Sequence, residues 1–557
     1  MLSDLEIARQ ATMRPIYDVA AKLSLQQDEL IPYGFYKAKI DQAKVMHRLE
    51  KERDGKIILV TAINPTPGGE GKTTVSIGLV EALHAMGKRA IGALREPSLG
   101  PVFGMKGGAA GGGFAQILPM EDLNLHFNGD IHAITAANNL AAALLDNHIF
   151  QGNEADIDIH NIAWSRCLDM NDRSLRNCVI GLGGKNDGLP RQEHFQISVA
   201  SEVMAVLCLA EDMKNLKARL AKMIMAYDRH GKPITAAQLQ AANPMAALLK
   251  DTLMPNLVQA LNHAPILIHG GPFANIAHGC SSVIATKLGR KLADYVVTEA
   301  GFGADLGAEK FLDIKCRLNG IKPAVVVIVA TVKALKYNGG VKKADLNMPN
   351  LSALQSGLNN LAKHIENMLG YNCKVIVAIN KFVSDTPSEI DTIKCFCESY
   401  QIKAVVTEAF AAGADGSLAL AEAVTDLAAE PDRELSFPYE LEDSYPSKIE
   451  KLARKIYGAG EIEISKLARQ KLAMYEREGL GGMPICVAKT QYSLSDQAGL
   501  LGRPTDFKFT VRDVNISAGA GFVLALAGNI MTMPGLPAQP AAFNIDIDDT
   551  GNIIGLF

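Results

Sequence analysis

A glycine-rich loop with one lysine and neighbouring threonines is the strongest chemical signal in the sequence. Residues 64–74 read NPTPGGEGKTT. Glycines let backbone N–H groups wrap around a phosphate, and a helix that begins here adds free N–H groups and a partial positive charge. Lys72 can reach the terminal phosphates, and the Thr73 hydroxyl can bind Mg²⁺. The loop predicts a nucleoside triphosphate site formed by Thr66, Pro67, Gly68, Gly69, Glu70, Gly71, Lys72, Thr73 and Thr74.

The loop departs from the strict P-loop pattern at one position. The pattern G-x-x-x-x-G-K-[ST] has glycine where this chain has Thr66, whereas Gly71, Lys72 and Thr73 match it. Partition ATPases, carboxylating ligases and motor proteins all use loops of this kind. The loop therefore predicts nucleotide binding and leaves the reaction open.

The elements around the loop have the order of a βαβ unit. A continuous apolar run over 56–63 predicts a buried strand, residues 71–86 a helix, and residues 89–94 a second strand. Strands that are apolar on both faces belong in a parallel sheet. Further buried strands are predicted at 264–268, 324–330, 374–379 and 403–407, with helices at 211–227 and 352–369. This alternation indicates an α/β protein.

The predicted architecture is a P-loop NTPase-like parallel-sheet domain with two further, smaller α/β domains. A length of 557 residues suggests about three or four domains at roughly 150 residues each. Glycines at 339–340 and a polar, proline-containing stretch at 428–446 suggest the boundaries. We expect domains over residues 1–340, which carry the loop, 341–440 and 441–557.

The composition narrows the class of protein. Lys and Arg total 56 against 60 Asp and Glu, which gives a net charge of -4 and no general attraction to nucleic acid or anionic membrane. The start of the chain reads as a helix with a Ser3–Glu6 capping box, not as a signal peptide. Nine scattered cysteines without metal or redox spacing indicate free thiols in a reducing compartment. We expect a soluble cytoplasmic protein.

Several polar side chains follow predicted strands or stand in polar loops. Arg95 comes directly after the strand that follows the loop helix, at the sheet edge where α/β proteins place their sites. His126, Asp130 and His132 are closely spaced, and either histidine can stabilise phosphate or transfer a proton. His269 follows another buried strand. The structural alternative for Arg95 is a surface ion pair, and the alternative for the histidines is a structural role in their loops. A zinc site at His126, Asp130 and His132 is disfavoured because no thiolate is nearby.

Ordered segments along nearly the whole chain resemble the formate–tetrahydrofolate ligase family. They include the loop, whose family version also has threonine at position 66, and they include REPSLGP at 95–101. The others are the glycine-rich run 107–113, NLHFNGDIH at 124–132, HGGPFANIAHG at 269–279, TEAGFGADLG at 298–307 and MTMPGLP at 531–537.

The resemblance implies a three-domain subunit, assembled as a homotetramer, that joins formate to tetrahydrofolate at the expense of MgATP. It implies that formate attacks the γ-phosphate to give formyl phosphate and ADP, and that the folate amine then takes the formyl group. A monovalent cation such as K⁺ or NH₄⁺ is implied as well. Lys72 and Arg95 would supply the positive charge that a polyanionic reaction needs, with Arg95 assigned to formyl phosphate. His126, Asp130, His132 and His269 are further catalytic candidates.

Two aromatic residues and two carboxylates are the remaining candidate site residues. The resemblance implies an aromatic clamp for the pterin, and Phe382 and Phe410 occupy its two positions, the second of which is typically Trp. This departure bears on folate affinity, and core packing is the alternative role of both rings. Glu299 and Asp305 can hold the cation, contact the pterin or relay the proton of the attacking amine.

The sequence is compatible with three alternative functions. A partition-type ATPase would hydrolyse ATP without formate or folate, and it leaves the Phe382 and Phe410 positions unexplained. A ligase of another small carboxylate or acceptor would keep the same chemistry. A non-catalytic relative is disfavoured by the intact Lys72, Thr73 and Arg95.

Overall fold

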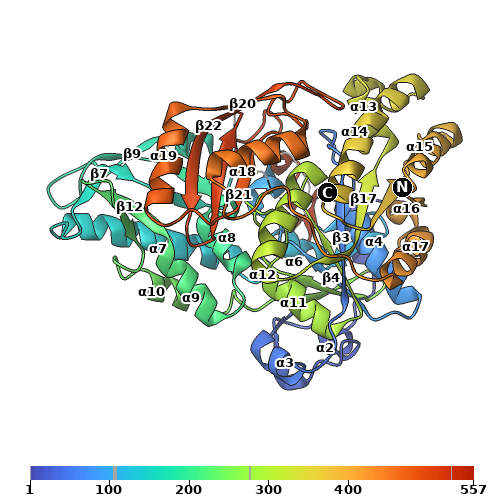
Figure 1. The fold of residues 1–557 in the computed structure, drawn as a ribbon. Coiled ribbons are helices and arrows are strands. Elements are labelled where there is room, and N and C mark those ends of the chain that lie inside the picture. Colours follow the sequence, from blue (N-terminus) through green and yellow to red (C-terminus); the bar gives the residue numbers. More distant parts are fainter. Residues whose placement is uncertain (1, 105–109, 275–276, 529, 557) are drawn as a thin grey trace.

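A twelve-stranded sheet forms the centre of the part of the chain that the structure describes (Figure 1). The structure is a computed structural model, and it describes residues 2–104, 110–274, 277–528 and 530–556. The strand order is β1-β2-β14-β15-β4-β16-β3-β17-β18-β19, with β6 beside β14 and β5 beside β6. The predicted α/β class is confirmed.

Neighbouring strands in the middle and at one edge of this sheet run parallel. They are β15 (Pro265–Ile268), β4 (Ala90–Leu94), β16 (Tyr295–Glu299), β3 (Lys56–Ala62), β17 (Pro323–Ala330), β18 (Val375–Asn380) and β19 (Ala404–Thr407). Every one of them except β16 was predicted as a strand from its apolar run. The predicted parallel arrangement is confirmed for these strands, whereas β14 pairs antiparallel with β15, β2 and β6 at the other side of the sheet.

The helices beside the parallel strands follow the predicted alternation. They are α4 (Lys72–Ala85), α11 (Val283–Leu292), α13 (Val332–Asn338), α14 (Leu351–Gly370), α15 (Pro387–Ser399), α16 (Ala409–Ala412) and α17 (Leu418–Ala429). Alternate residues of β3 enter different cores: Ile57 and Leu59 pack with α14, and Ile58 and Val60 pack with α4 and α17. A strand with helices on both faces buries every side chain, which accounts for its continuous apolar run.

The N-terminal segment contributes the two strands, β1 and β2, at one edge of the sheet. Helix α1 (Asp4–Gln10) begins with the predicted capping box, in which Ser3 and Glu6 satisfy each other's backbone N–H groups. The elements that follow are α2 (Ile16–Ala21), β1 (Leu30–Pro32), β2 (Ala38–Ile40) and α3 (Gln42–Arg48).

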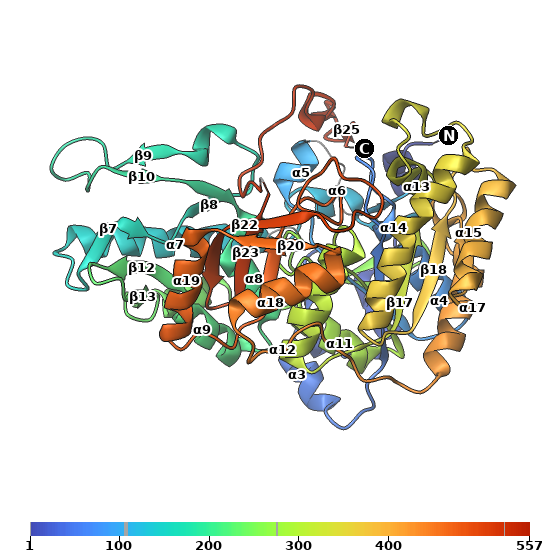
Figure 2. The ribbon, with the colours of Figure 1, turned by 45° about the horizontal axis from the view of Figure 1, so that its top comes forward.

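A large insertion separates β4 from β15, and its hairpin β9–β10 projects from the molecule (Figure 2). The first elements are α5 (Leu99–Phe103), β5 (Gly111–Gly112), β6 (Ala115–Leu118), α6 (Met120–Asn124), α7 (Asp130–Phe150), β7 (Ile157–Ile162), β8 (Arg166–Leu168), β9 (Cys178–Ile180), β10 (Arg191–Glu193) and β11 (Phe195–Ile197). Then come α8 (Glu202–Leu209), α9 (Met213–Lys222), β12 (Ile224–Asp228), β13 (Pro233–Thr235), α10 (Ala242–Leu248) and β14 (Asn256–Ala260).

The helix predicted over 211–227 is wrong at its C-terminal end. Helix α9 ends at Lys222, and Ile224 begins β12, which pairs with β13 and β7. Met225 and Ala226 are fully buried in this strand. Pairing with strands distant in sequence overrides the local helical pattern at these residues.

A second sheet, in the order β20-β22-β23-β21, follows the polar connection near residue 440. Its elements are α18 (Tyr445–Leu452), β20 (Glu461–Ile464), α19 (Lys466–Arg477), β21 (Ile485–Ala488), β22 (Lys508–Ser517) and β23 (Phe522–Ala527), followed by β24 (Asp546–Ile547) and β25 (Ile553–Ile554). The central sheet continues past residue 340 through β18 and β19. The domain boundaries stay predictions.

Helices of the described ranges are all too short or too polar to cross a bilayer.

Candidate functional site

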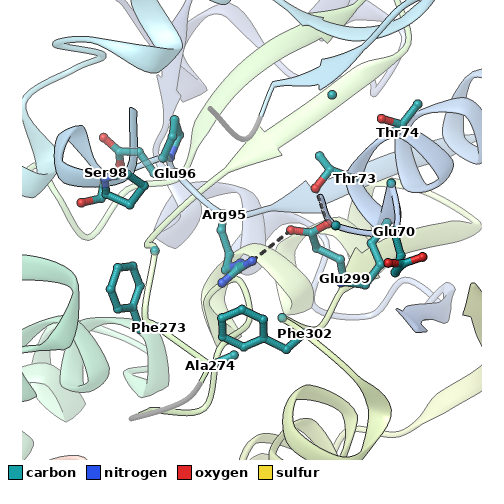
Figure 3. A pocket seen from close by; sticks show the side chains of 18 of the residues that line it. Glu70, Thr73, Thr74, Arg95, Glu96, Ser98, Phe273, Ala274, Glu299 and Phe302 are labelled. Atoms are coloured by element: carbon teal, nitrogen blue, oxygen red, sulfur yellow. Dashed lines mark hydrogen bonds and ion pairs between the residues drawn. The ribbon is translucent and has the colours of Figure 1, made fainter. Parts of the chain in front are cut away.

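A cavity of about 410 Å³ lies at the carboxyl ends of the parallel strands (Figure 3). The loop after β3, the segment after β4 and the end of β16 all reach it, as expected for a doubly wound sheet. Its lining comprises Gly68, Gly69, Glu70, Gly71, Lys72, Thr73, Thr74, Arg95, Glu96, Pro97, Ser98, Pro101, Val102, Gly111, Gly271, Phe273, Ala274, Glu299, Gly301 and Phe302. The predicted phosphate loop and Arg95 therefore share one cavity.

Backbone geometry at the end of the loop requires a glycine. Gly71 precedes α4 with φ of 71°, in the left-handed region. A Cβ at this position would lie 2.5 Å from Nδ2 of Asn380, which itself donates to the Glu70 carbonyl at 3.1 Å. Asn380 is the last residue of β18, so the loop is braced against the end of a second strand.

A buried carboxyl group braces the loop from inside. Glu70 is 1% exposed; its Oε1 accepts from the backbone N–H of Thr66 at 2.7 Å, and its Oε2 accepts from the Thr331 hydroxyl after β17. Burial raises the pKa of Glu70. Thr66, where the sequence departs from the strict pattern, therefore takes part through its backbone in fixing the loop.

One carboxylate connects the loop to Arg95. Glu299, the last residue of β16, is 2% exposed; its Oε2 accepts from the Thr73 hydroxyl at 2.8 Å, and its Oε1 lies 3.5 Å from Nη2 of Arg95 (Figure 3). Arg95 also donates to the carbonyl of Pro272 at 3.3 Å. These contacts place the Arg95 guanidinium, the Glu299 carboxylate and the Thr73 hydroxyl close together near the N-terminus of α4. A helix N-terminus and a guanidinium both favour an anionic group such as phosphate.

The other polar candidates lie outside the cavity lining. His126 and His132 are exposed. Asp130 is 3% exposed and accepts two hydrogen bonds from Nζ of Lys39, at 2.8 and 2.9 Å, and one from the Asn256 amide at 2.7 Å. Asp130 and His132 begin the same helix, α7, but Asp130 is buried and His132 is exposed, since neighbouring helix positions face different directions. The catalytic roles of His126, Asp130 and His132 stay predictions.

His269 is fully buried, and both of its ring nitrogens have hydrogen-bond partners. Its ring is 0% exposed, with Nδ1 2.6 Å from the Ser282 hydroxyl and Nε2 2.7 Å from the Thr252 carbonyl. Burial lowers the pKa of His269 to about 3. The ring therefore stays neutral at physiological pH and holds β15 to the start of α11.

We predict that His269 makes the protein sensitive to mild acid. The pKa of His269 is lower in the folded than in the unfolded protein, so between about pH 6.5 and pH 4 only the unfolded chain binds this proton. As the pH falls through this range, His269 therefore lowers the free energy of unfolding by roughly 1.4 kcal/mol for each pH unit. His269→Gln should make the decline shallower in urea unfolding across this range. His47→Gln, at an exposed helix position, is the control. If the free energy of unfolding fell equally steeply with decreasing pH in the two variants, His269 would not be the source of the acid sensitivity.

Asp305 is a buried link between the two sheets. Its carboxylate is 0% exposed, lies 2.5 Å from Nζ of Lys489 after β21, and accepts from the Asn64 amide at 3.1 Å. Asp305 is not part of the cavity lining, whereas Glu299 is. The two carboxylates that sequence could not distinguish thus occupy different environments.

The two predicted folate residues follow neighbouring strands at the same edge of the sheet. Phe382 follows β18 and is 36% exposed, and Phe410 lies in α16 after β19 and is 44% exposed. Nζ of Lys333 lies 4.5 Å from the centre of the Phe382 ring. The backbone N–H of Phe114 donates to the Phe410 carbonyl at 2.8 Å, and a Cβ on Gly113 would lie 2.0 Å from that oxygen. Large exposed rings are available for stacking, and the core-packing alternative does not fit them.

Sequence reasoning missed several residues of the site. Glu96 and Ser98 line the cavity directly after Arg95, and Asn380 braces the loop. Burial, with Asp130 and Asp169 nearby, raises the pKa of Glu96 well above its usual value. Phe273 and Phe302 also line the cavity. Four of these residues follow parallel strands and Asn380 is the last residue of one, so a systematic search of strand ends would have found them.

A sequence profile described as formate–tetrahydrofolate ligase matches residues 2–557. The chain belongs to the formate–tetrahydrofolate ligase family. Members are ligases that form a carbon–nitrogen bond, with ATP and tetrahydrofolate as substrates. Family membership removes the partition-ATPase alternative.

A solved structure of a glycine-to-serine mutant of L. casei FPGS is 10% identical, covers 85% of this chain and 88% of that chain, and gives a TM-score of 0.21. A similarity at this level indicates neither the fold nor the function of the present chain. Parts of two segments that carry the family resemblance, residues 107–109 and 275–276, lie outside the described residues. Among the described residues no group of three or more His, Cys, Asp and Glu side chains is placed to hold a metal.

Proposed function

We propose that this ligase activates formate as formyl phosphate in the cavity at the start of α4 and passes the formyl group to tetrahydrofolate. The observation that carries the proposal is the connection Thr73–Glu299–Arg95, which joins the nucleotide loop to a second cation in one cavity.

In the first step a formate oxygen attacks the γ-phosphorus of MgATP, and the bond to the β-phosphate oxygen breaks to release ADP. Lys72 and the N-terminus of α4 neutralise the phosphate oxygens, and Thr73 binds the Mg²⁺ that arrives with the nucleotide. Arg95 draws the formate carboxylate and the γ-phosphate together, since a guanidinium can contact oxygens of both. Positioning and charge, not covalent catalysis, provide the acceleration.

In the second step the folate amine attacks the formyl carbon, and the carbon–oxygen bond to phosphate breaks. Arg95 stabilises the phosphate that leaves. The amine must lose a proton, and Glu299, which lines the cavity beside Arg95, is placed to accept it, whereas Asp305 lies outside the lining and is held by Lys489. We assign proton transfer to Glu299 and a structural role to Asp305.

Phe382 and Phe410 are proposed to hold the pterin ring between them. Replacing a stacking ring by alanine costs about 1–3 kcal/mol in comparable sites, so Phe410→Ala should raise the KM for tetrahydrofolate roughly 5- to 150-fold. Phe410→Trp should lower it, because indole offers a larger stacking area. The KM values for ATP and formate serve as internal controls. Equal folate KM values in all three proteins would remove Phe410 from the folate site.

The activity is tested by mixing the protein with MgATP, formate and tetrahydrofolate, then acidifying and reading the absorbance of the methenyl derivative of formylated folate. Controls omit each substrate in turn, and one replaces formate with acetate. Product that requires all three substrates and is absent with acetate supports the proposal. Equal folate-dependent release of ADP with acetate would instead support a ligase of broader carboxylate specificity.

Two implications of the resemblance remain proposals. A monovalent cation, K⁺ or NH₄⁺, is expected to stimulate the reaction, and a homotetramer is the expected assembly. Activity in matched K⁺ and choline buffers tests the first, and light scattering measures the mass for the second.

A further inference from the structure

Phe302 has a backbone conformation that bulky side chains avoid. Its φ is 59°, in the left-handed region. The flanking residues impose this conformation: the N–H of Gly301 donates to the Gly279 carbonyl at 2.9 Å, and the Gly303 carbonyl accepts from Leu306 and Gly307 at 3.0 and 2.9 Å. Strained residues held in this way concentrate at functional sites.

The Phe302 ring contributes to the cavity and not to the core. It lines the cavity, is partly exposed, and is absent from the hydrophobic clusters of the described residues. Phe311, a few residues later, is fully buried in one of these clusters. Core packing therefore does not account for a strained phenylalanine at position 302.

The chain before Phe302 passes directly beside Arg95. A Cβ on Gly301 would lie 3.1 Å from Nη1 of Arg95 and 2.6 Å from Cβ of Ala274. Figure 3 shows the Phe302 and Phe273 rings on different sides of the Arg95 guanidinium group. Phe273 packs against a core cluster through its other contacts. Two apolar rings thus border the position where Arg95 would hold the acyl phosphate.

We propose that Phe302, with Phe273, excludes water from the formyl phosphate until the folate amine attacks it. This inference rests on the proposed function. Water that reached the intermediate would attack the formyl carbon and break the bond between this carbon and the phosphate oxygen. The products would be formate and dihydrogen phosphate. Each such event would consume one ATP without forming a carbon–nitrogen bond. Apolar side chains that displace water from a reactive centre prevent this loss.

The test is the ratio of ADP to formyl folate produced at saturating substrates. In the unsubstituted protein the ratio should be one. In Phe302→Ala and Phe302→Gly it should rise severalfold, with ADP formation still dependent on formate, and Phe302→Tyr should restore it close to one. Glycine adopts positive φ without strain, so Phe302→Gly should remain folded even if the alanine variant does not. Phe35→Ala, at an 81% exposed position, is the control.

The possible results separate the water-exclusion role of Phe302 from the proposed function. A ratio of one in the glycine variant, with or without a lower rate, would overturn the water-exclusion role. Excess ADP that forms without formate would overturn it as well, since water would then attack ATP and not the intermediate. Absence of formyl folate from the unsubstituted protein would refute the proposed function itself.

Discussion

Replacing Arg95 with alanine should lower kcat for formyl transfer on the order of 10³-fold, while ATP still binds. An arginine that stabilises a transferring phosphoryl group contributes at least this much in comparable enzymes. ATP should still bind because the loop and Lys72 remain braced by Glu70 and Asn380. Steady-state kinetics and equilibrium binding of a nucleotide analogue would measure the two effects separately.

The matched control is Arg89→Ala. Arg89 immediately precedes β4, as Arg95 immediately follows it, and its exposed side chain pairs with Asp294 at 2.6 Å. An exposed pair of this kind contributes little, so activity should remain near that of the unsubstituted protein. Normal formylation by the Arg95 variant would show that Arg95 does not hold the reacting groups.

Replacing Lys72 with alanine should lower kcat/KM for ATP roughly 10²- to 10³-fold, because one charge that faces the terminal phosphates is lost. Unlike the Arg95 variant, this protein should also bind the nucleotide more weakly. The difference between the variants follows from their positions: Lys72 begins α4 inside the loop, and Arg95 approaches from the next strand. Initial rates over a range of ATP concentrations would distinguish the two.

Lys88→Ala provides the comparison for Lys72, because Lys88 is exposed just beyond the other end of α4. Its kinetic constants should match those of the unsubstituted protein. If Lys72→Ala and Lys88→Ala behaved alike, the loop would not be the nucleotide site.

The sequence was most informative where local pattern and position coincide. The run at 56–63, the glycine loop and the helix after it predicted β3, the loop and α4, because each depends on nearby residues only. Arg95 was found by the same logic, from its place after a strand. Phe382 and Phe410 were expected from the family resemblance, and their exposure leaves them available for a ligand.

Contacts between distant segments could not be predicted from local pattern. Nothing near Glu299 indicates that it would meet Thr73, because the pairing of β16 between β4 and β3 brings them together. The hydrogen bonds of His269 to Ser282 and Thr252 likewise join segments that local pattern does not bring together. The environment of Asp130 also depends on distant segments, because Lys39 and Asn256 hold its carboxylate.

The most direct test of formyl phosphate formation uses formate labelled with ¹⁸O in both oxygens. If a formate oxygen attacks the γ-phosphorus, the phosphate released after formyl transfer must carry one labelled oxygen per turnover, which mass spectrometry of the phosphate would measure. This label should appear with the unsubstituted protein, in proportion to the formyl folate formed. Formyl folate that accumulates with unlabelled phosphate would contradict the intermediate, since the formate oxygen would then never have been bonded to phosphorus.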